Sequence, residues 1–334
     1  MRVFSLVMLI VGGFIGAGFA SGREIATYFS KFGKASYLGV IIAMLILFLL
    51  VYFFLMLSEK FNSFGDLIKS IFGKFSRFIN LLFIMCILII VSTMIAGSGE
   101  VAQSLGFNKI IVMCITVLLT YFITIGNVKS IDMVSKILVP IMLIIIIYIG
   151  LSSKGESTIF NGKYMSSIIS GISYIFINII SLGLFILSIG KKYTKKQKIM
   201  ASLLVSLIIG IVLAILNYSI LKNDVISSSM PVLELSKNKG FYLYLITTIT
   251  IWLALLTTLI SNVYILKNYL SKFISNDYFL VFLILILGAL LSFFGFEFMV
   301  NYVYMFIGGV GLLLVLKLII KEKEAIKINR FKNL

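Results

Sequence analysis

A glycine-rich stretch at residues 11–24, VGGFIGAGFASGRE, constrains this chain most, because it interrupts the first apolar segment. Five of these residues are glycine, which weakens a helix and lets other groups approach the backbone closely. Non-helical backbone survives at membrane depth only where it is buried in protein or lines a cavity. We therefore expect a broken helix beside a cavity, with free amide and carbonyl groups that can face a solute.

Two other interpretations of this stretch stay open. The pairs Gly12 with Gly16 and Gly18 with Gly22 have the small-xxx-small spacing that marks close packing of a continuous span. A basic start, an apolar run and small residues around 17–22 also imitate a signal peptide. Cleavage there would leave an odd number of spans, which argues against a signal peptide.

The composition is that of an integral membrane protein, because 61% of the 334 residues are apolar and only 12% are charged. Ten apolar runs are long enough to cross a bilayer, which takes about 20 helical residues. The runs cover residues 3–29, 37–57, 78–105, 109–126, 128–151, 164–189, 199–221, 241–270, 278–294 and 302–320.

The basic residues predict the orientation of these spans. With the N-terminus inside, the inner segments carry 19 Lys and Arg residues and the outer segments carry eight. Such an excess follows the positive-inside rule, so we expect both termini in the cytoplasm and the spans in the plasma membrane. The net charge of +17 then reflects orientation and lipid contact, and we expect no nucleic acid partner.

Several function classes are excluded by what the chain lacks. It has no histidine, and its two cysteines, Cys86 and Cys114, both lie in apolar runs. They give neither a disulfide framework nor metal-ligand spacing. No connection exceeds about 20 residues, which leaves no room for a soluble catalytic or nucleotide-binding domain. We therefore expect a single membrane domain over 1–334 that has no catalytic residues and needs no cofactor. We also expect that the protein is not an enzyme.

Ten spans divide into two sets of five, 3–151 and 164–320, followed by a tail at 321–334. Because five is odd, two such repeats run in opposite directions, and their first helices meet at the midplane. The sixth span should then be irregular as well, and it carries SGISYIFINIISLG at 170–183. We expect Tyr174, Asn178 and Ser181 to contact a solute there, although such residues also pair helices in ordinary packing.

The motif GFIGAGFASGRE at 13–24 resembles the opening motif of the YkvI-like bacterial membrane proteins. This group is related to the amino acid, polyamine and organocation transporters, and the resemblance covers the whole chain in length and span count. It implies the all-α fold of the sodium-coupled leucine transporter, a five-plus-five inverted repeat with discontinuous first and sixth helices.

The resemblance also implies a site for one sodium ion. Its ligands would be the carbonyls of Gly12, Ile15 and Ala254. The hydroxyls of Thr257 and Thr258 would complete a neutral oxygen shell. The alternative is that both threonines only bond the preceding helical turn.

Two further positions follow from the same resemblance. Gly16, Ala17 and Gly18 match the GlyXaaGly of the unwound first helix. Phe19 stands where symporters with a second sodium site have asparagine, so one sodium ion is expected.

Ionisable residues within spans are costly and mark candidate functional sites. Lys136 in the fifth span matches a lysine that some relatives use as a proton carrier. Asp132 lies four residues earlier on the same helix face, and Pro140 frees the Lys136 carbonyl, so a structural ion pair is the other explanation.

A second group of charges, Arg23, Glu24, Glu100 and Glu297, lies toward the outer ends of the spans. An arginine and a carboxylate there can form a gate over a bound solute. The same residues can instead reach the membrane interface singly.

These expectations combine into a secondary transporter of an amino acid or similar small zwitterion, with sodium as coupling ion. Coupling to protons through Lys136 is the alternative, as is a non-transporting nutrient or germinant receptor on the same fold. The partners expected are a small-molecule substrate and the lipid bilayer, and a protein partner is not specified. The predicted substrate-binding residues are Gly13, Gly16, Ala17, Gly18, Tyr174, Asn178 and Ser181.

Overall fold

The computed structural model describes residues 2–61, 64–126 and 129–332, and over them the fold is helical apart from one bridge between Gly33 and Asn161. The long helices are α4 (Ser36–Leu57), α6 (Ser76–Ser104), α7 (Lys109–Ile125), α8 (Lys129–Ser152), α9 (Tyr164–Ile189), α10 (Lys195–Lys222), α12 (Phe241–Leu270), α13 (Asp277–Ser292) and α15 (Tyr304–Lys332). The shorter elements are α1 (Arg2–Phe14), α2 (Ala17–Ser21), α3 (Arg23–Tyr28), η1 (Ser30–Phe32), α5 (Phe64–Phe72), η2 (Gly73–Phe75), η3 (Gly190–Lys192), α11 (Pro231–Lys237), α14 (Phe296–Phe298) and the π-helical η4 (Met299–Val303).

Nine of the ten predicted ranges coincide with one long helix each, and the first range is divided among α1, α2 and α3. By length and composition, five of the described helices can each cross a membrane, and a sixth span results if the two parts of α9 count together. Further apolar helices are shorter. The chain is therefore a multi-pass membrane protein, while the count of ten spans in a five-plus-five repeat stays a prediction.

The first predicted span is broken twice, and both breaks fall at glycine. The Gly16 N–H donates to the Phe14 carbonyl at 2.9 Å instead of to the residue four positions back, and Gly16 is extended, with φ −84° and ψ −178°. Gly22 then ends α2 in the left-handed region, with φ +80°, which favours glycine. The predicted break in the first helix is thus confirmed, and continuous packing through residues 12–18 is not what forms.

The sixth predicted span is bent. Helix α9 is helical throughout Tyr164–Ile189, but its parts Tyr164–Ile180 and Phe185–Lys192 meet at an angle of 52°. The irregularity expected in 170–183 therefore takes the form of a bend near its end, without an extended residue like Gly16.

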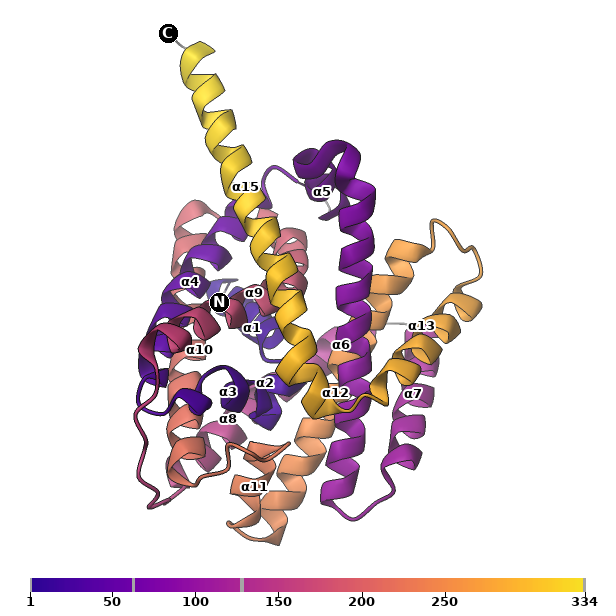
Figure 1. The fold of residues 1–334 in the computed structure, drawn as a ribbon. Helices are drawn as coiled ribbons and strands as arrows, with labels where there is room; N and C mark the ends of the chain where they lie inside the picture. Colours follow the sequence, from indigo (N-terminus) through magenta and orange to yellow (C-terminus); the bar gives the residue numbers. More distant parts are fainter. Residues whose placement is uncertain (1, 62–63, 127–128, 333–334) are drawn as a thin grey trace.

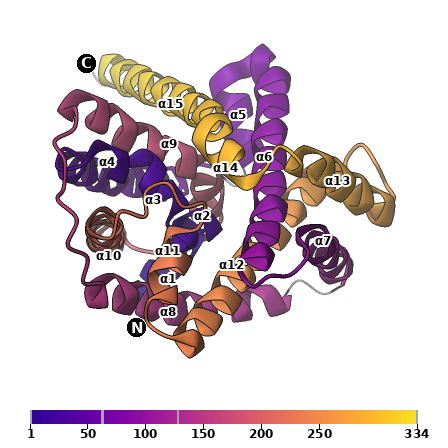
Figure 2. The ribbon, with the colours of Figure 1, turned by 60° about the horizontal axis from the view of Figure 1, so that its bottom comes forward.

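Helix α1 lies inside the molecule, where α8, α9 and α10 pack around it. Its side chains Leu6, Ile10, Val11 and Phe14 are buried. In Figure 2, α1, α2 and α3 run through the middle of the bundle, while Figure 1 shows α5 and the end of α15 on one side and α11 on the other. The first break therefore lies in the interior of the protein.

Candidate functional site

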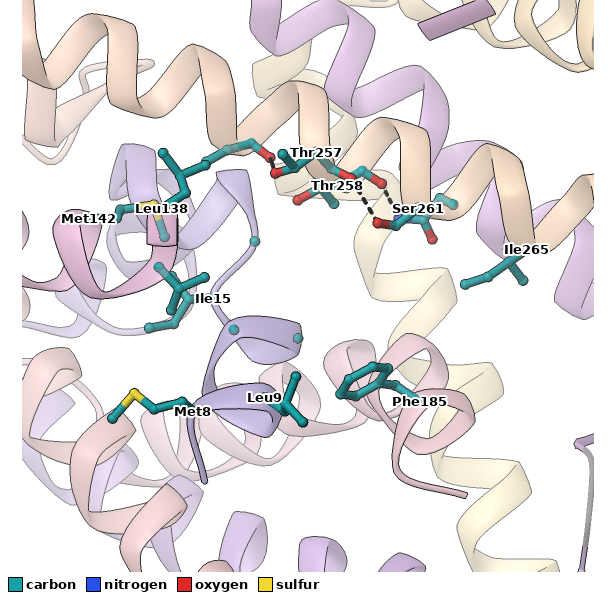
Figure 3. Close-up of a pocket in the computed structure, with 16 residues that line it drawn as sticks. Met8, Leu9, Ile15, Leu138, Met142, Phe185, Thr257, Thr258, Ser261 and Ile265 are labelled. Carbon is teal, nitrogen blue, oxygen red and sulfur yellow. Dashed lines mark hydrogen bonds between the residues drawn. The ribbon is translucent and has the colours of Figure 1, made fainter. Parts of the chain in front are cut away.

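A cavity of about 190 Å³ borders the first break. Its walls come from α1, α8, α9 and α12, and Figure 3 shows Ile15 and Leu138 on one side of it and Thr257 and Thr258 on the other. The cavity brings together seven of the predicted site residues, which are Gly12, Gly13, Ile15, Gly16, Ala254, Thr257 and Thr258.

Glycine at the end of α1 lets neighbouring helices come close to the cavity. A methyl group on Gly12 would lie 3.1 Å from Cγ2 of Val139 on α8. One on Gly13 would lie 3.3 Å from Cδ1 of Leu182 on α9. Both distances are shorter than ordinary van der Waals contact, so larger residues would push α8 or α9 away.

The two threonines of α12 differ in their hydrogen bonds. The Thr257 hydroxyl donates to the Ala254 carbonyl at 3.1 Å, as the local alternative expected. The Thr258 hydroxyl has no hydrogen-bond partner among the described residues, although it lines the cavity. Thr258 is therefore the more available ligand for a cation or solute.

Sequence reasoning missed Ser261 and Asn262, which extend the polar wall of the cavity along α12. The Asn262 amide donates to the Thr258 carbonyl at 2.8 Å, and its own buried Oδ1 has no hydrogen-bond partner within the described chain. Their helical spacing from Ala254 and Thr258 was the available signal, since positions three and four apart share a helix face.

The predicted contacts on α9 lie apart from this cavity. Tyr174 is fully buried, and its ring packs edge-on against Phe14 and Phe29 at centroid distances of 5.9 and 5.2 Å. The Asn178 amide donates to the Tyr174 carbonyl at 3.1 Å. From α9 the cavity is lined by Phe185 instead. The side chains of Ser181 and Ala17 lie outside the described residues.

The predicted arginine and carboxylate pair is present at the outer charges. Arg23 Nη2 lies 2.5 Å from Glu297 Oε1, and Arg23 Nη1 donates to the Ser228 carbonyl at 2.8 Å. Glu100 and Glu297 line the same hollow, of about 370 Å³, but Glu100 pairs with Lys109. Whether the Arg23 pair acts as a gate stays a prediction.

Glu24 does not join that group. Its side chain is buried, and a methyl group on Gly18 would overlap its Oε1. The left-handed turn at Gly22 starts a new helix, so Arg23 and Glu24 leave α3 in different directions. The sequence placed Glu24 toward the outer end of its span. In the structure its carboxylate lies against α2, and its part in a gate stays a prediction.

The remaining predicted site, Lys136 with its neighbour Asp132, has side chains outside the described residues. Both the proton-carrier role of Lys136 and its ion pair therefore stay predictions.

No family model matches the chain, but curated proteins do. The membrane protein YkvI of Bacillus subtilis (strain 168) is 32% identical over 143 residues, which are 42% of this chain and 41% of YkvI. The chain thus matches less than half the length of YkvI. The protein YyaD of the same strain is 25% identical over 328 residues, which are 94% of this chain and 95% of YyaD.

Solved structures share the fold at low sequence identity. MhsT in complex with L-phenylalanine has a TM-score of 0.66 and 17% identity, over 93% of this chain and 87% of MhsT. An inward-facing conformation of Mhp1 has a TM-score of 0.63 and 15% identity, over 93% of this chain and 73% of Mhp1. A manganese transporter of Eremococcus coleocola has a TM-score of 0.55 and 14% identity, over 94% of this chain and 76% of the transporter. The chain is therefore similar in sequence to the membrane protein YkvI and to the protein YyaD, and it shares its fold with MhsT and Mhp1.

Proposed function

We propose that this chain is a secondary transporter that carries an amino acid or similar small zwitterion together with sodium, by alternating access around the cavity. The break at Ile15 and Gly16 is the observation that carries the proposal, because it frees backbone groups beside a cavity lined by hydroxyls. Transporter sites are built from such interrupted helices. The binding of L-phenylalanine by MhsT, which has the same fold, supports an amino acid as substrate.

The helix contacts support a ten-span inverted repeat. In such a repeat α1 is equivalent to α9, α4 to α10, and α8 to α15. Helix α1 packs against α10 just as α9 packs against α4, and α1 packs against α8 just as α9 packs against α15. These two contacts of α1 thus have their counterparts in contacts of α9. Both termini would then lie in the cytoplasm, as the basic residues indicate.

The residues at the cavity fit a small monovalent cation as co-transported ion. Carbonyl and hydroxyl oxygens are hard, neutral ligands, which suit sodium better than a transition metal. The carbonyls of Gly12, Ile15 and Ala254 and the hydroxyls of Thr257 and Thr258 would hold it. The Thr258 hydroxyl supports this most, because it makes no bond within the described part of its own helix.

Reconstitution in liposomes tests the proposal. Uptake of a panel of amino acids is measured under an imposed sodium gradient, an imposed proton gradient or neither. The wild-type protein should concentrate at least one amino acid when the sodium gradient is present. Absence of uptake for every amino acid under every gradient would reject transport of this substrate class.

Substitution of Thr258 tests the cation site. Loss of a ligand to a charged group costs about 1.5–3 kcal/mol, so Thr258→Val should weaken sodium activation roughly tenfold to hundredfold. Thr258→Ser keeps the hydroxyl and should restore it. Thr250→Val is the matched control, because the Thr250 hydroxyl bonds the Ile246 carbonyl and lies away from the cavity. Unchanged sodium activation in Thr258→Val would rule out this site.

A further inference from the structure

Glu24 is a buried carboxylate that has no counter-charge among the described side chains. Its residue is 6% exposed, and no Lys or Arg nitrogen of the described chain lies within 4 Å of it. The adjacent Arg23 points to Glu297. An ionised carboxylate in such surroundings is strongly unfavourable unless a positive charge compensates it. No basic side chain among the described residues therefore neutralises Glu24.

The packing around Glu24 leaves room for a proton more readily than for a larger cation. The Oε1, Cδ and Cγ atoms of Glu24 all lie where a Gly18 side chain would begin, so the carboxylate rests directly on the backbone of α2. A metal ion or an ammonium group needs a shell of ligands and space of its own. A proton needs neither, because it becomes part of the carboxyl group.

Tyrosine hydroxyls are the polar groups that face this carboxylate. Glu24 interacts electrostatically with Tyr28 on α3, Tyr174 on α9 and Tyr304 on α15. The Tyr174 hydroxyl is buried and lies close enough to Glu24 to interact with its carboxylate. Other titratable groups on the elements packed against α3 point elsewhere: Arg23 to Glu297, Lys31 over the ring of Phe32, Lys198 to Glu59, and Tyr164, Tyr218 and Tyr302 to the surface.

We propose that Glu24 is a proton-binding site of the transport cycle, which is protonated in this conformation and releases its proton when α2 and α3 move. The carboxylate takes one proton from water on one side of the membrane and returns it on the other, so charge and atoms balance. The inference rests on the proposed transport function, because it needs a conformational cycle. The site lies where such a cycle acts, since α3, which carries Glu24, packs against α9, α10 and η4 of the proposed second half.

Infrared difference spectroscopy tests the proton itself, without any substrate. Purified full-length protein is compared at neutral and alkaline pH in the carbonyl-stretch region of protonated carboxyl groups. The wild-type protein should show a carboxyl signal that persists at neutral pH and disappears at alkaline pH. Glu24→Gln should lack it, and Glu156→Gln, which changes an exposed carboxylate, should retain it. A wild-type protein without such a signal overturns the proposal whether or not the variant folds.

Uptake in liposomes then tests the coupling. With an amino acid that the wild-type protein transports, Glu24→Gln should remove the dependence of uptake on a pH gradient while sodium activation remains. Thr258→Val should weaken sodium activation, while the dependence of uptake on the pH gradient remains. Wild-type uptake that ignores the pH gradient overturns the coupling. Absence of all uptake by the wild-type protein instead rejects the transport function, and the infrared signal still decides whether Glu24 binds a proton.

Discussion

Gly18 is the residue on which the packing of α2 against α3 depends. The end of the Glu24 side chain occupies the position that a β-carbon would take, and its burial restricts any sideways movement. Gly16 differs, because a methyl group there would meet no heavy atom within 4 Å. The two glycines of the GlyXaaGly motif thus have separate roles, one in the break and one in close contact.

Gly18→Ala should therefore destabilise the protein by about 1–3 kcal/mol, the usual cost of overpacking a well-filled interior. The midpoint of thermal unfolding in detergent measures it. In a Glu24→Ala background the same substitution should cost much less, because the overlapping atoms are gone. Gly16→Ala is the control and should shift the midpoint little. Equal losses in both backgrounds would contradict this contact.

The sequence predicted the composition of the cavity better than the position of individual charges. Gly12, Ile15, Ala254 and Thr258 come together because helical spacing and one glycine break suffice to place them. The burial of Glu24 against α2 was not predicted, because a single left-handed residue at Gly22 reorients everything that follows it. Such a turn has only a weak local signal in a stretch that holds five glycines.

Among the elements, α3 is tied to distant parts of the chain by side-chain hydrogen bonds. The Thr27 hydroxyl donates to the Asn301 side-chain oxygen at 2.7 Å, and the Tyr28 hydroxyl donates to the Val300 carbonyl at 3.2 Å. Both partners belong to η4, a π-helical turn, and such turns often occur at functional sites. Movement of α3 must therefore be transmitted to the start of α15.

Arg23 ties α3 to the loop before α11 as well. Its guanidinium donates to the Ser228 carbonyl at 2.8 Å and approaches those of Ile226 and Ser227 at 3.5 and 3.4 Å. Arg23→Gln removes charged hydrogen bonds worth about 1.5–3 kcal/mol, so amide hydrogen exchange in 224–230 should accelerate roughly tenfold to hundredfold.

Glu297→Gln separates the two contributions of Arg23, because it removes the ion pair and leaves the loop carbonyls in place. We expect a smaller acceleration of exchange from this variant. An effect as large as that of Arg23→Gln would mean that the ion pair, not the carbonyl contacts, orders the loop.

Prediction of the elements succeeded where bilayer thickness sets their length. Nine long helices follow the apolar runs because each run must satisfy its own backbone hydrogen bonds in lipid. Helix α11 begins at Pro231, a residue that suits the first turn of a helix. Helix α5 was missed, because its nine residues are too few for a span and its charges read as a loop. The 52° bend of α9 depends on tertiary packing that no local pattern encodes.

At the scale of the whole molecule, a few polar contacts join the two halves. Asn217 of α10 is fully buried, donates to the Ser36 hydroxyl at 2.7 Å and accepts from the Ser30 hydroxyl at 2.9 Å. At the other end of α10, Lys198 is fully buried and donates to Glu59, which follows α4, at 2.6 Å. Helix α10 is thus fixed to α4 near both of its ends.

The Lys198 contact should make stability depend on pH. The hydrogen bond and the charge of Lys198 hold the pKa of the Glu59 carboxyl below its ordinary value of 4.5. A depressed folded-state pKa adds stability above the ordinary value, and this stability is lost as the pH falls through the depressed one. Glu59→Gln should therefore melt lower than the wild-type protein at about pH 7, and the difference should shrink below pH 4.5.

Glu156→Gln is the control for this titration, because Glu156 is exposed. Its melting temperature should follow that of the wild-type protein at every pH. The melting temperatures of Glu59→Gln and the wild-type protein could instead differ by the same amount at pH 7 and in the acid range. That result would show that the charge of the Glu59 carboxylate does not link the halves.

The first span is three rigid pieces joined at Gly16 and Gly22, and the middle piece, α2, has only five residues. A short helix with a flexible glycine at each end can rotate about its axis while the flanking helices α1 and α3 keep their positions. Less than two helical turns would then have to rotate, since a turn takes 3.6 residues. Under the proposed transport function, the conformational change would then be concentrated at two glycine residues and would not require the displacement of a whole helix bundle.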